Sequence, residues 1–457
     1  MGVFGEKSQT GSRSFKQFQL SSLSTGFLIF ISAGMGLAQS AGWSDHHVPV
    51  QHLHFYYSWL IAVIMGALLS LPLRNILPRK FLMGISSVFI LAGGIIFVSL
   101  SHNVDALIAS RYLNGVAIGL MTVPYLMHAS EISPDNCRGL ATGLEQFAVT
   151  VGMAIQTIAS SQWNAKSCFT VNCFHGIMDT ILAVLSLASL YYFIESPVDF
   201  LRFGDDAAAL DCLAALQRPQ GATMATHRRL VELKDYVLEH SNLSIMESLK
   251  RSSLPLVKMI LYRSTILAFT SSMVLTVVAN IAVRVNGATW SPVLGALLHI
   301  FGSCLTLAVV DKLGRKIPSI IWILCMGALL MPAAVIMGYL ENVLNVAKMR
   351  TITSIWLSIQ LFAGLFAANT STYVSEAFPL RTKSYCMTLC VIVEQIIRII
   401  IIARADYYGS DISLMAMSII AMIAGACLLV MLPETRKTTL KEAQDSLRFF
   451  FNFGRQD

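Results

Sequence analysis

Charged side chains are scarce in this chain of 457 residues. Asp, Glu, Lys and Arg together make up 13% of it, against about a quarter of an ordinary soluble domain. Hydrophobic residues reach 55%, and the mean hydropathy is +0.64. Such a composition excludes a water-soluble globular domain. The net charge of +7 is scattered over many connections, so it offers no single basic face to a nucleic acid and we expect no nucleic-acid partner.

Other features are missing as well. No spacing of Cys and His resembles a structural zinc site, and no hydrolytic or redox constellation appears, so we expect neither a metal, nor a cofactor, nor an enzyme. The first apolar run ends without a clear cleavage site, which favours an anchor over a removed leader.

Cys168 and Cys173 share one loop. A disulfide between them stays open, since five residues is a tight spacing.

What the chain has is long apolar runs. Runs of about 20 residues are long enough to cross a bilayer as helices, and they predict an all-α membrane protein. Six precede a polar segment of about sixty residues and six follow it, roughly at 21–39, 55–73, 81–100, 106–132, 140–160, 177–194, 265–283, 292–310, 317–340, 351–374, 386–402 and 412–431. We expect two six-helix bundles.

The arginines and lysines predict the orientation. With the N-terminus inside, 26 of them fall on inside segments and five on outside ones, so both termini are expected in the cytoplasm. The expected units are an N-terminal tail at 1–20, a bundle at 21–194, a cytoplasmic loop at 195–264, a second bundle at 265–432 and a tail at 433–457. Within the loop, apolar residues at helical spacing predict short amphipathic helices at 206–217, 225–239 and 245–250; a flexible linker is the alternative.

The two bundles carry related motifs. SEISP at 130–134 returns as SEAFP at 375–379, LPRK at 77–80 as LGRK at 313–316, and ESP at 195–197 as PET at 433–435. Repeats at nearly one offset indicate a duplicated unit, and in a membrane chain they suggest two bundles that alternate around a central site. The charged residues of these motifs lie at the expected cytoplasmic helix ends.

Taken together, these motifs resemble those of the sugar porters of the major facilitator superfamily. RYLNG at 111–115 with RG at 138–139, DKLGRK at 311–316, and the ESP and PET motifs are similar to that family's ordered signatures. The broad pattern is most similar to insect-type sugar and trehalose facilitators. The resemblance implies twelve helices that rock between two states, a plasma-membrane location and a small sugar as the partner besides the bilayer; the oligomeric state stays open.

The resemblance also implies a cytoplasmic gate built from ion pairs. We expected Glu131 to pair with Arg138, Glu376 with Arg381 and Asp311 with Arg315. The complete set of expected gate residues is Arg79, Glu131, Arg138, Glu195, Asp311, Arg315, Glu376, Arg381 and Glu434. One element departs from the family: Asn75 and Pro78 replace an acid and a glycine, so the gate is expected to hold less tightly on the N-terminal side. The alternative is that all these charges are solvated and form no gate.

Sugar hydroxyls need neutral donors and acceptors, and sugar rings stack on aromatic side chains. Gln146 matches the family's glutamine on helix five, about 12 Å along the helix from Arg138. Gln156 on the same helix, Asn369 on helix ten and Gln395 on helix eleven are further candidates. The family's motifs on helices seven and ten are largely replaced, so hexose contacts cannot be transferred residue by residue.

Glu394 and Arg398 are spaced i, i+4 inside helix eleven, where they can pair. Charges at membrane depth are costly unless they are paired or face a cavity. They indicate a contact for a charged solute, a proton site together with Glu145, or a self-neutralised structural pair. Helix one has no acid between Ser21 and Trp43, which argues against proton coupling of the usual sugar-porter kind.

The sequence therefore favours facilitated diffusion of a hexose or disaccharide by alternating access. Two alternatives remain at this point. One is a relative that senses sugar without transporting it, and the other is a transporter of a different polar or charged solute.

Overall fold

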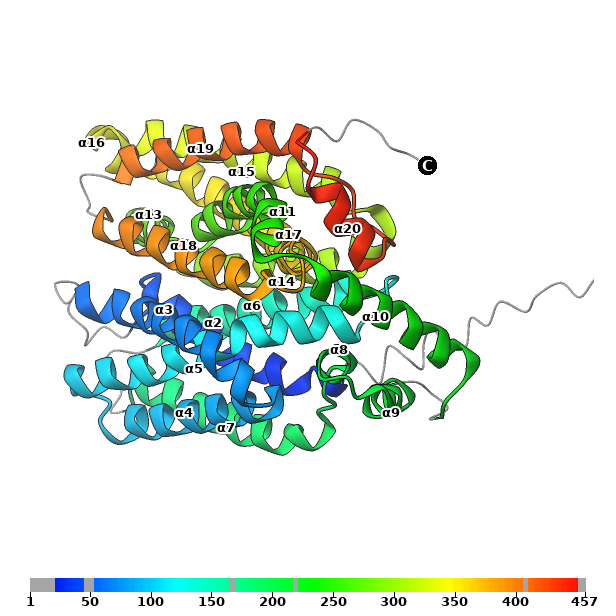
Figure 1. Cartoon of the computed structure of the whole chain (residues 1–457). Coiled ribbons are helices and arrows are strands. Elements are labelled where there is room, and N and C mark those ends of the chain that lie inside the picture. Colours follow the sequence, from blue (N-terminus) through cyan, green and yellow to red (C-terminus); the bar gives the residue numbers. More distant parts are fainter. Residues whose placement is uncertain (1–20, 45–52, 164–168, 217–220, 406–409, 451–457) are drawn as a thin grey trace, which may run out of the picture.

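The computed structural model describes residues 21–44, 53–163, 169–216, 221–405 and 410–450. Within these ranges the regular structure is helical and no strand occurs. The helices form two groups that lie side by side with their axes roughly parallel (Figure 1). We call the group α2–α7 the N-half and the group α11–α19 the C-half.

The N-half contains six long helices: α2 (Ser24–Ser40), α3 (Leu53–Ile76), α4 (Arg79–Ser99), α5 (Val104–Ile132), α6 (Arg138–Gln162) and α7 (Val171–Ser189). The C-half is built from α11 (Ile245–Met259), a π-helical turn (Ile260–Thr265), α12 (Ile266–Thr270), α13 (Met273–Asn286), α14 (Ser291–Leu313), α15 (Lys316–Met337), the short α16 (Leu340–Val343), α17 (Val346–Glu376), α18 (Lys383–Ala403) and α19 (Ser410–Met431).

Ten helices of the described residues are long and apolar enough to cross a membrane. The 17-residue α2 and the more polar α6 complete the twelve expected spans. The repeat extends to helix capping. Asn103 begins α5 by accepting bonds from two backbone N–H groups of the first turn, and Asn345 does the same for α17.

The seventh span differs from the expected 265–283. It is one nearly continuous rod from Ile245 to Asn286, interrupted only by the π-helical turn and by a break at Ser271, whose φ of −130° and ψ of 48° are not helical. The short helix predicted at 245–250 is thus the start of this rod. Arg263, which makes the sequence look too polar for a membrane span, lies inside the rod and is buried.

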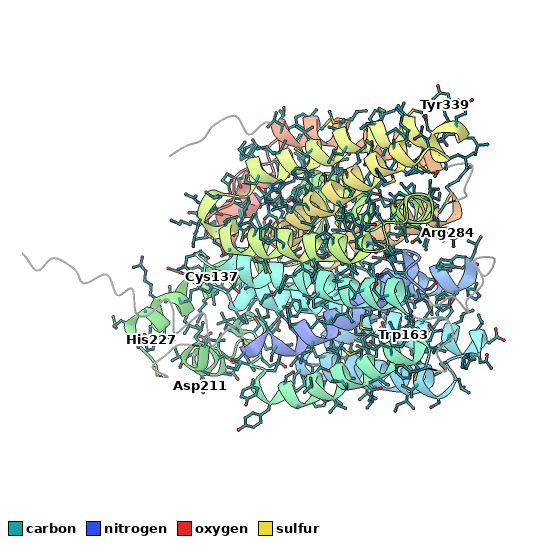
Figure 2. The ribbon with its side chains drawn as sticks, turned by 180° about the vertical axis from the view of Figure 1, so that it is seen from behind. Cys137, Trp163, Asp211, His227, Arg284 and Tyr339 are labelled. Atoms are coloured by element: carbon teal, nitrogen blue, oxygen red, sulfur yellow. The ribbon has the colours of Figure 1, made fainter. Side chains whose placement is uncertain are left out.

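The polar segment between the halves folds onto one end of the helices, which we call the loop end. There α8 (Pro197–Arg202), α9 (Asp206–Leu216) and α10 (Met224–Asn242) lie near the C-terminal α20 (Leu440–Leu447) (Figure 1). The predicted helices at 206–217 and 225–239 correspond to α9 and α10. In Figure 2, Cys137, Asp211 and His227 lie toward the loop end, whereas Trp163, Arg284 and Tyr339 lie toward the opposite end.

The N-half and the C-half meet along α6 with α14 and α17, and along α3 with α18. Within the N-half, α2 and α6 approach so closely that a Cβ added to Gly34 would lie 2.0 Å from the carbonyl oxygen of Val149. Here glycine is needed because backbone meets backbone, as is common between membrane helices.

We therefore expect Gly34→Ala to destabilise the protein by about 1–3 kcal/mol, the usual effect of overpacking. Thermal unfolding of the purified protein measures the change. Gly84→Ala is the matched control, because a Cβ there would meet only Leu190 Cδ1, at an ordinary 3.5 Å. Equal melting temperatures for both variants would contradict the close packing of α2 on α6.

Candidate functional site

Acids and bases at the loop end form one cluster in each half. In the N-half, Arg79 donates to Glu131 and contacts Asp199, each at 2.8 Å. Glu195 accepts the backbone N–H of Lys80 at 3.1 Å. Burial raises the pKa of Glu195 and of Asp199, although neighbouring cations oppose the effect.

The C-half repeats this arrangement with matching residues. Arg315 donates to Glu376 at 2.9 Å and to Asp311 at 3.1 Å. Glu434 accepts the backbone N–H groups of Arg315 and Lys316 at 2.8 and 3.1 Å, as Glu195 does in the N-half. The duplicated motifs thus build two copies of one charged cluster.

Bonds between the two clusters join the halves. Arg138 of the N-half donates to Glu376 of the C-half at 3.1 Å, and Lys383 of the C-half donates to Ser130 of the N-half at 2.9 Å. All four side chains are buried. Because a buried carboxylate that serves two arginines is largely shielded from water, this contact is stronger than an exposed ion pair.

One further link between the halves exists in only one copy. Asp311 accepts the backbone N–H groups of Gly139 and Leu140, the first turn of α6, at 3.1 and 3.0 Å. The equivalent residue in the N-half repeat is Asn75, whose side chain bonds only to Leu71 of its own helix, at 3.4 Å. The contacts between the halves are therefore asymmetric, because Asp311 forms a link that Asn75 does not.

Two pairs expected from the sequence are not formed. Glu131 pairs with Arg79 instead of Arg138, because the turn before α6 directs Arg138 toward Glu376 and nearby Asp135. Arg381 donates to the backbone carbonyl of Leu243 at 2.6 Å and has no carboxylate partner among the described residues. The expected pair of Asp311 and Arg315 is present.

Between the halves lies a central cavity of about 50 Å³, with room for a few water molecules. Glu145, Gln146, Glu394, Gln395 and Arg398 line it, so five residues that the sequence singles out meet at one place. Gln146 donates to Glu145 at 2.9 Å. The Oε1 atom of Gln395 is buried and has no partner in the described structure, so it can accept a bond from a solute.

An ion pair crosses this cavity from one half to the other. Arg263, on the π-helical turn, donates to both carboxylate oxygens of Glu145 at 3.0 and 3.3 Å. Glu145 also accepts from Ser371 of α17, and Glu394 pairs with Arg398 at 3.1 Å as predicted. Sequence reasoning missed Arg263, because a lone arginine 18 residues after the start of a polar helix looks like part of the loop.

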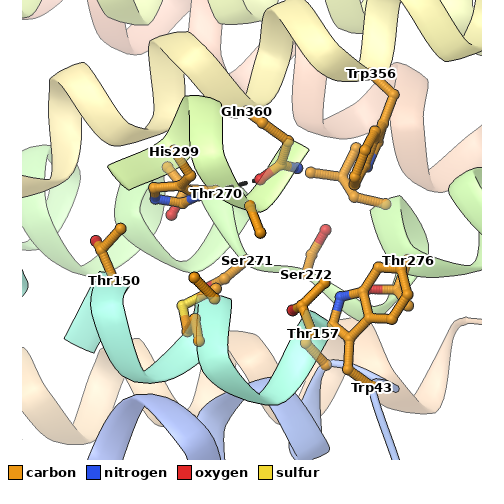
Figure 3. A pocket seen from close by; sticks show the side chains of 15 residues that line it. Trp43, Thr150, Thr157, Thr270, Ser271, Ser272, Thr276, His299, Trp356 and Gln360 are labelled. Atoms are coloured by element: carbon orange, nitrogen blue, oxygen red, sulfur yellow. Dashed lines mark hydrogen bonds between the residues drawn. The ribbon is translucent and has the colours of Figure 1, made fainter. Parts of the chain in front are cut away.

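A second cavity, of about 30 Å³, lies nearer the opposite end (Figure 3). Its polar lining is neutral and includes two tryptophans. Figure 3 shows Trp43, His299, Trp356 and Gln360 around it, and His299 bonds to Gln360 at 3.1 Å. The indole N–H of Trp356 is buried without an acceptor in the described structure. A smaller hollow beside Arg398 and Ser271 shares lining residues with both cavities.

Two sequence candidates line neither cavity. Gln156 donates to the backbone carbonyl of Trp43 at 3.1 Å and contacts His175 at 2.9 Å, so it supports the second cavity from behind. Asn369 donates to the backbone carbonyl of Arg315 at 3.1 Å, which places it beside the loop-end cluster. Cys168 lies outside the described residues.

Arg111 is buried within the N-half and is held only by neutral groups there. It donates to Gln39 at 2.5 Å, to Ser40 at 2.6 Å and to the backbone carbonyl of Phe55 at 2.9 Å. Its guanidinium lies 4.4 Å from the centre of the Phe55 ring. No carboxylate among the described residues pairs with it.

With this geometry established, known proteins provide a comparison. The family described as "Sugar (and other) transporter" matches residues 19–447 of the chain. The chain belongs to this family. It is therefore a membrane transporter and not an enzyme.

Curated relatives resemble it over most of their length. "Sugar transporter ERD6-like 7" of Arabidopsis thaliana is 22% identical over 89% of this chain and 88% of its own. "Galactose-proton symporter" of Escherichia coli is 22% identical over 85% and 84%. Among solved structures, the major facilitator superfamily proton:xylose symporter XylE bound to 6-bromo-6-deoxy-D-glucose superposes with a TM-score of 0.75 at 17% identity, over 95% of this chain and 99% of its own. The fold is that of the major facilitator superfamily.

Proposed function

We propose that this transporter carries a neutral sugar, a hexose or disaccharide, down its gradient across the plasma membrane. The single observation that carries the proposal is the pair of cavities between the halves. They combine tryptophan faces with neutral donors and acceptors, and two of these groups, Gln395 Oε1 and Trp356 Nε1, are buried and have no partner among the described residues. Sugar recognition uses such groups. The names of the relatives, a sugar transporter and a galactose-proton symporter, support a sugar as the solute.

The geometry of the cavities and of the loop end supports transport by alternating access. Each cavity is far smaller than the roughly 300–1,000 Å³ of ligand pockets, so the halves must part to admit a sugar. The bonds between Arg138, Lys383, Asp311 and the opposite half lie at the loop end alone. We infer that this end faces the cytoplasm, as the excess of Lys and Arg suggests, and that its network closes that side.

Facilitated diffusion fits the buried charges better than proton coupling. Arg111 is surrounded by neutral acceptors, and Glu145 and Glu394 are each paired with an arginine. Each of these two carboxylates therefore already has an arginine as its counter-charge, and neither faces the cavity as an isolated acid.

The experiment is uptake of labelled glucose, fructose, trehalose and several organic ions into proteoliposomes, with and without a pH gradient. We expect saturable sugar uptake that ignores the gradient. Gln395→Ala removes one hydrogen bond to the sugar and should raise KM about 2–10-fold. Asn242→Ala is the control, since this exposed amide lies at the end of α10, away from both cavities. Folded protein that moves no sugar would instead favour the sensor or another solute.

A charged solute is the second candidate, and the position of Glu394 favours it. This carboxylate lines the central cavity and lies 3.7 Å from Arg263 as well as beside Arg398. If it binds solute directly, Glu394→Gln abolishes transport while the protein still folds. We expect the other outcome, in which the variant lowers yield and melting temperature, and the remaining folded protein retains sugar uptake.

A further inference from the structure

A separate hollow of about 450 Å³ opens at the loop end of the N-half, between the α3–α4 turn and α8. It is much larger than the two cavities between the halves, and the described residues around it place it outside the path between them. Its charged lining comprises Arg74, Arg79, Glu195, Asp199 and Arg202, and Phe200 and Phe203 are its aromatic residues.

The charges in this hollow do not cancel. Asp199 is taken by Arg79, and Glu195 accepts a backbone N–H. Arg74 has no carboxylate within 4.0 Å among the described residues; its one hydrogen bond runs to the sulfur of Met127. Arg202 likewise has no ion-pair partner there. Arg74 and Arg202 therefore face the hollow without an ion-pair partner among the described residues, and with Arg79 they outnumber its two lining carboxylates, Glu195 and Asp199.

A buried donor also points to a missing acceptor. Arg79 is 7% exposed, and its Nη1 atom has no partner although Nη2 and Nε are engaged. A buried N–H group of a charged side chain without an acceptor is costly. An anion in the hollow would satisfy it together with Arg74.

The internal repeat shows which charge is missing. In the C-half copy, Asp311 occupies the position of Asn75 and bonds to its arginine and to the first turn of α6. The N-half copy has no acid at this position. Arg79 takes its second carboxylate from Asp199 instead, and Arg74, which aligns with Val310 of the C-half, has no carboxylate within 4.0 Å among the described residues. A bound anion would supply the charge that Asn75 lacks.

The rim of the hollow shows what kind of molecule carries the anion. Ile76 is 75% exposed and Phe203 is 85% exposed, and both line the hollow. Exposed aromatic and aliphatic side chains beside basic residues at a helix end are typical of the bilayer interface. Basic pockets between membrane helices at this level bind acidic lipid headgroups.

We propose that this hollow binds the phosphate group of an anionic phospholipid, with Arg74, Arg202 and the free Nη1 of Arg79 as its donors and the exposed apolar rim against the acyl chains. The bound phosphate stabilises the position of Arg79, which holds Glu131 near the contact between Lys383 and Ser130. The headgroup thereby favours the closed loop end. This inference does not depend on which solute is transported.

The test measures binding of labelled phosphatidic acid and labelled phosphatidylcholine to the full-length protein in neutral detergent. We expect a preference for phosphatidic acid. Arg74→Gln should weaken its binding roughly tenfold, as the loss of one charge-assisted contact does. Arg228→Gln removes the same charge from an exposed site on α10, where the arginine is 85% exposed, and should leave the binding unchanged.

Asn75→Asp provides a second variant that restores a carboxylate instead of removing a cation. It should also weaken the binding of phosphatidic acid, because the new carboxylate occupies Arg74 and Arg79, while thermal stability is kept or raised. Equal binding of both lipids by the unmodified protein would overturn the proposal, as would an unchanged preference in Arg74→Gln and Asn75→Asp. Displacement of the lipid by inorganic phosphate alone would keep the anion site but overturn its assignment to a lipid.

Discussion

Glu376→Gln is expected to open the loop end of this transporter. The carboxylate of Glu376 is fully buried and accepts bonds from Arg138 of the N-half and Arg315 of the C-half. Glutamine leaves both guanidinium groups without their shared counter-charge. Breaking a buried pair in this way costs about 3–5 kcal/mol. This cost falls mainly on the closed state, in which the halves meet, so we expect a shift of roughly a hundredfold or more toward the open state.

Hydrogen exchange of the α6 amides measures this opening without added labels. In the closed state the N–H groups of Gly139 and Leu140 donate to Asp311 across the interface, and they lose these acceptors when the halves part. Their exchange should accelerate in Glu376→Gln. Glu232→Gln removes an equal charge at the loop end, where the side chain is 48% exposed, and should leave the exchange unchanged. Slow exchange in both variants would show that Glu376 does not hold the halves together.

The helices could be predicted because their cause is local. A run of about 20 apolar residues has no stable place except the bilayer, and asparagine caps and repeated motifs mark helix ends in the sequence itself. The seventh span was predicted at the wrong position because that prediction, too, used only the local sequence. Its first part, from Ile245 to Met259, is amphipathic, and only packing against the rest of the C-half shows that it continues into the membrane.

Partners of the charged residues were harder to predict, because pairing depends on tertiary structure. Glu131 and Arg138 are seven residues apart, and the turn between them separates their side chains. Their actual partners, Arg79 and Glu376, are 52 and 238 residues away in sequence. The internal repeat nevertheless indicated these partners, since the pair of Arg79 and Glu131 matches the pair of Arg315 and Glu376.

Residues of the candidate site could be predicted only where their side chains are unusual for a membrane helix. Glu394 and Arg398 stand out because charges are rare inside a membrane helix. Trp356 and Gln360 do not, since neither is unusual on a helix of ordinary composition. They acquire significance only when folding brings α17 beside α14 and the end of α2. The same holds for Arg263, whose partner Glu145 lies 118 residues earlier.

The pair of Glu145 and Arg263 should show the second large effect. Both side chains are 3% exposed and join the halves at the central cavity. Glu145→Gln leaves Arg263 with Ser371 as a neutral acceptor at 2.9 Å and with Glu394, at 3.7 Å, as its remaining carboxylate among the described residues, so we expect a loss of about 3–5 kcal/mol in stability. Arg263→Gln should be similarly harmful, because it leaves the carboxylate of Glu145 buried with Ser371 and Gln146 as its remaining partners.

The double variant Glu145→Gln/Arg263→Gln distinguishes a specific pair from general disruption. With both charges gone, two amides can bond to each other and no buried ion is left unpaired, so most of the lost stability should return. Thermal unfolding of the two single variants and the double variant gives the coupling. The matched cycle uses Arg228 and Glu232, an exposed pair on α10, which should show coupling below about 1 kcal/mol. Additive losses at Glu145 and Arg263 would mean that each residue acts through other neighbours. Strong coupling would show that the two charges stabilise each other across the interface between the halves.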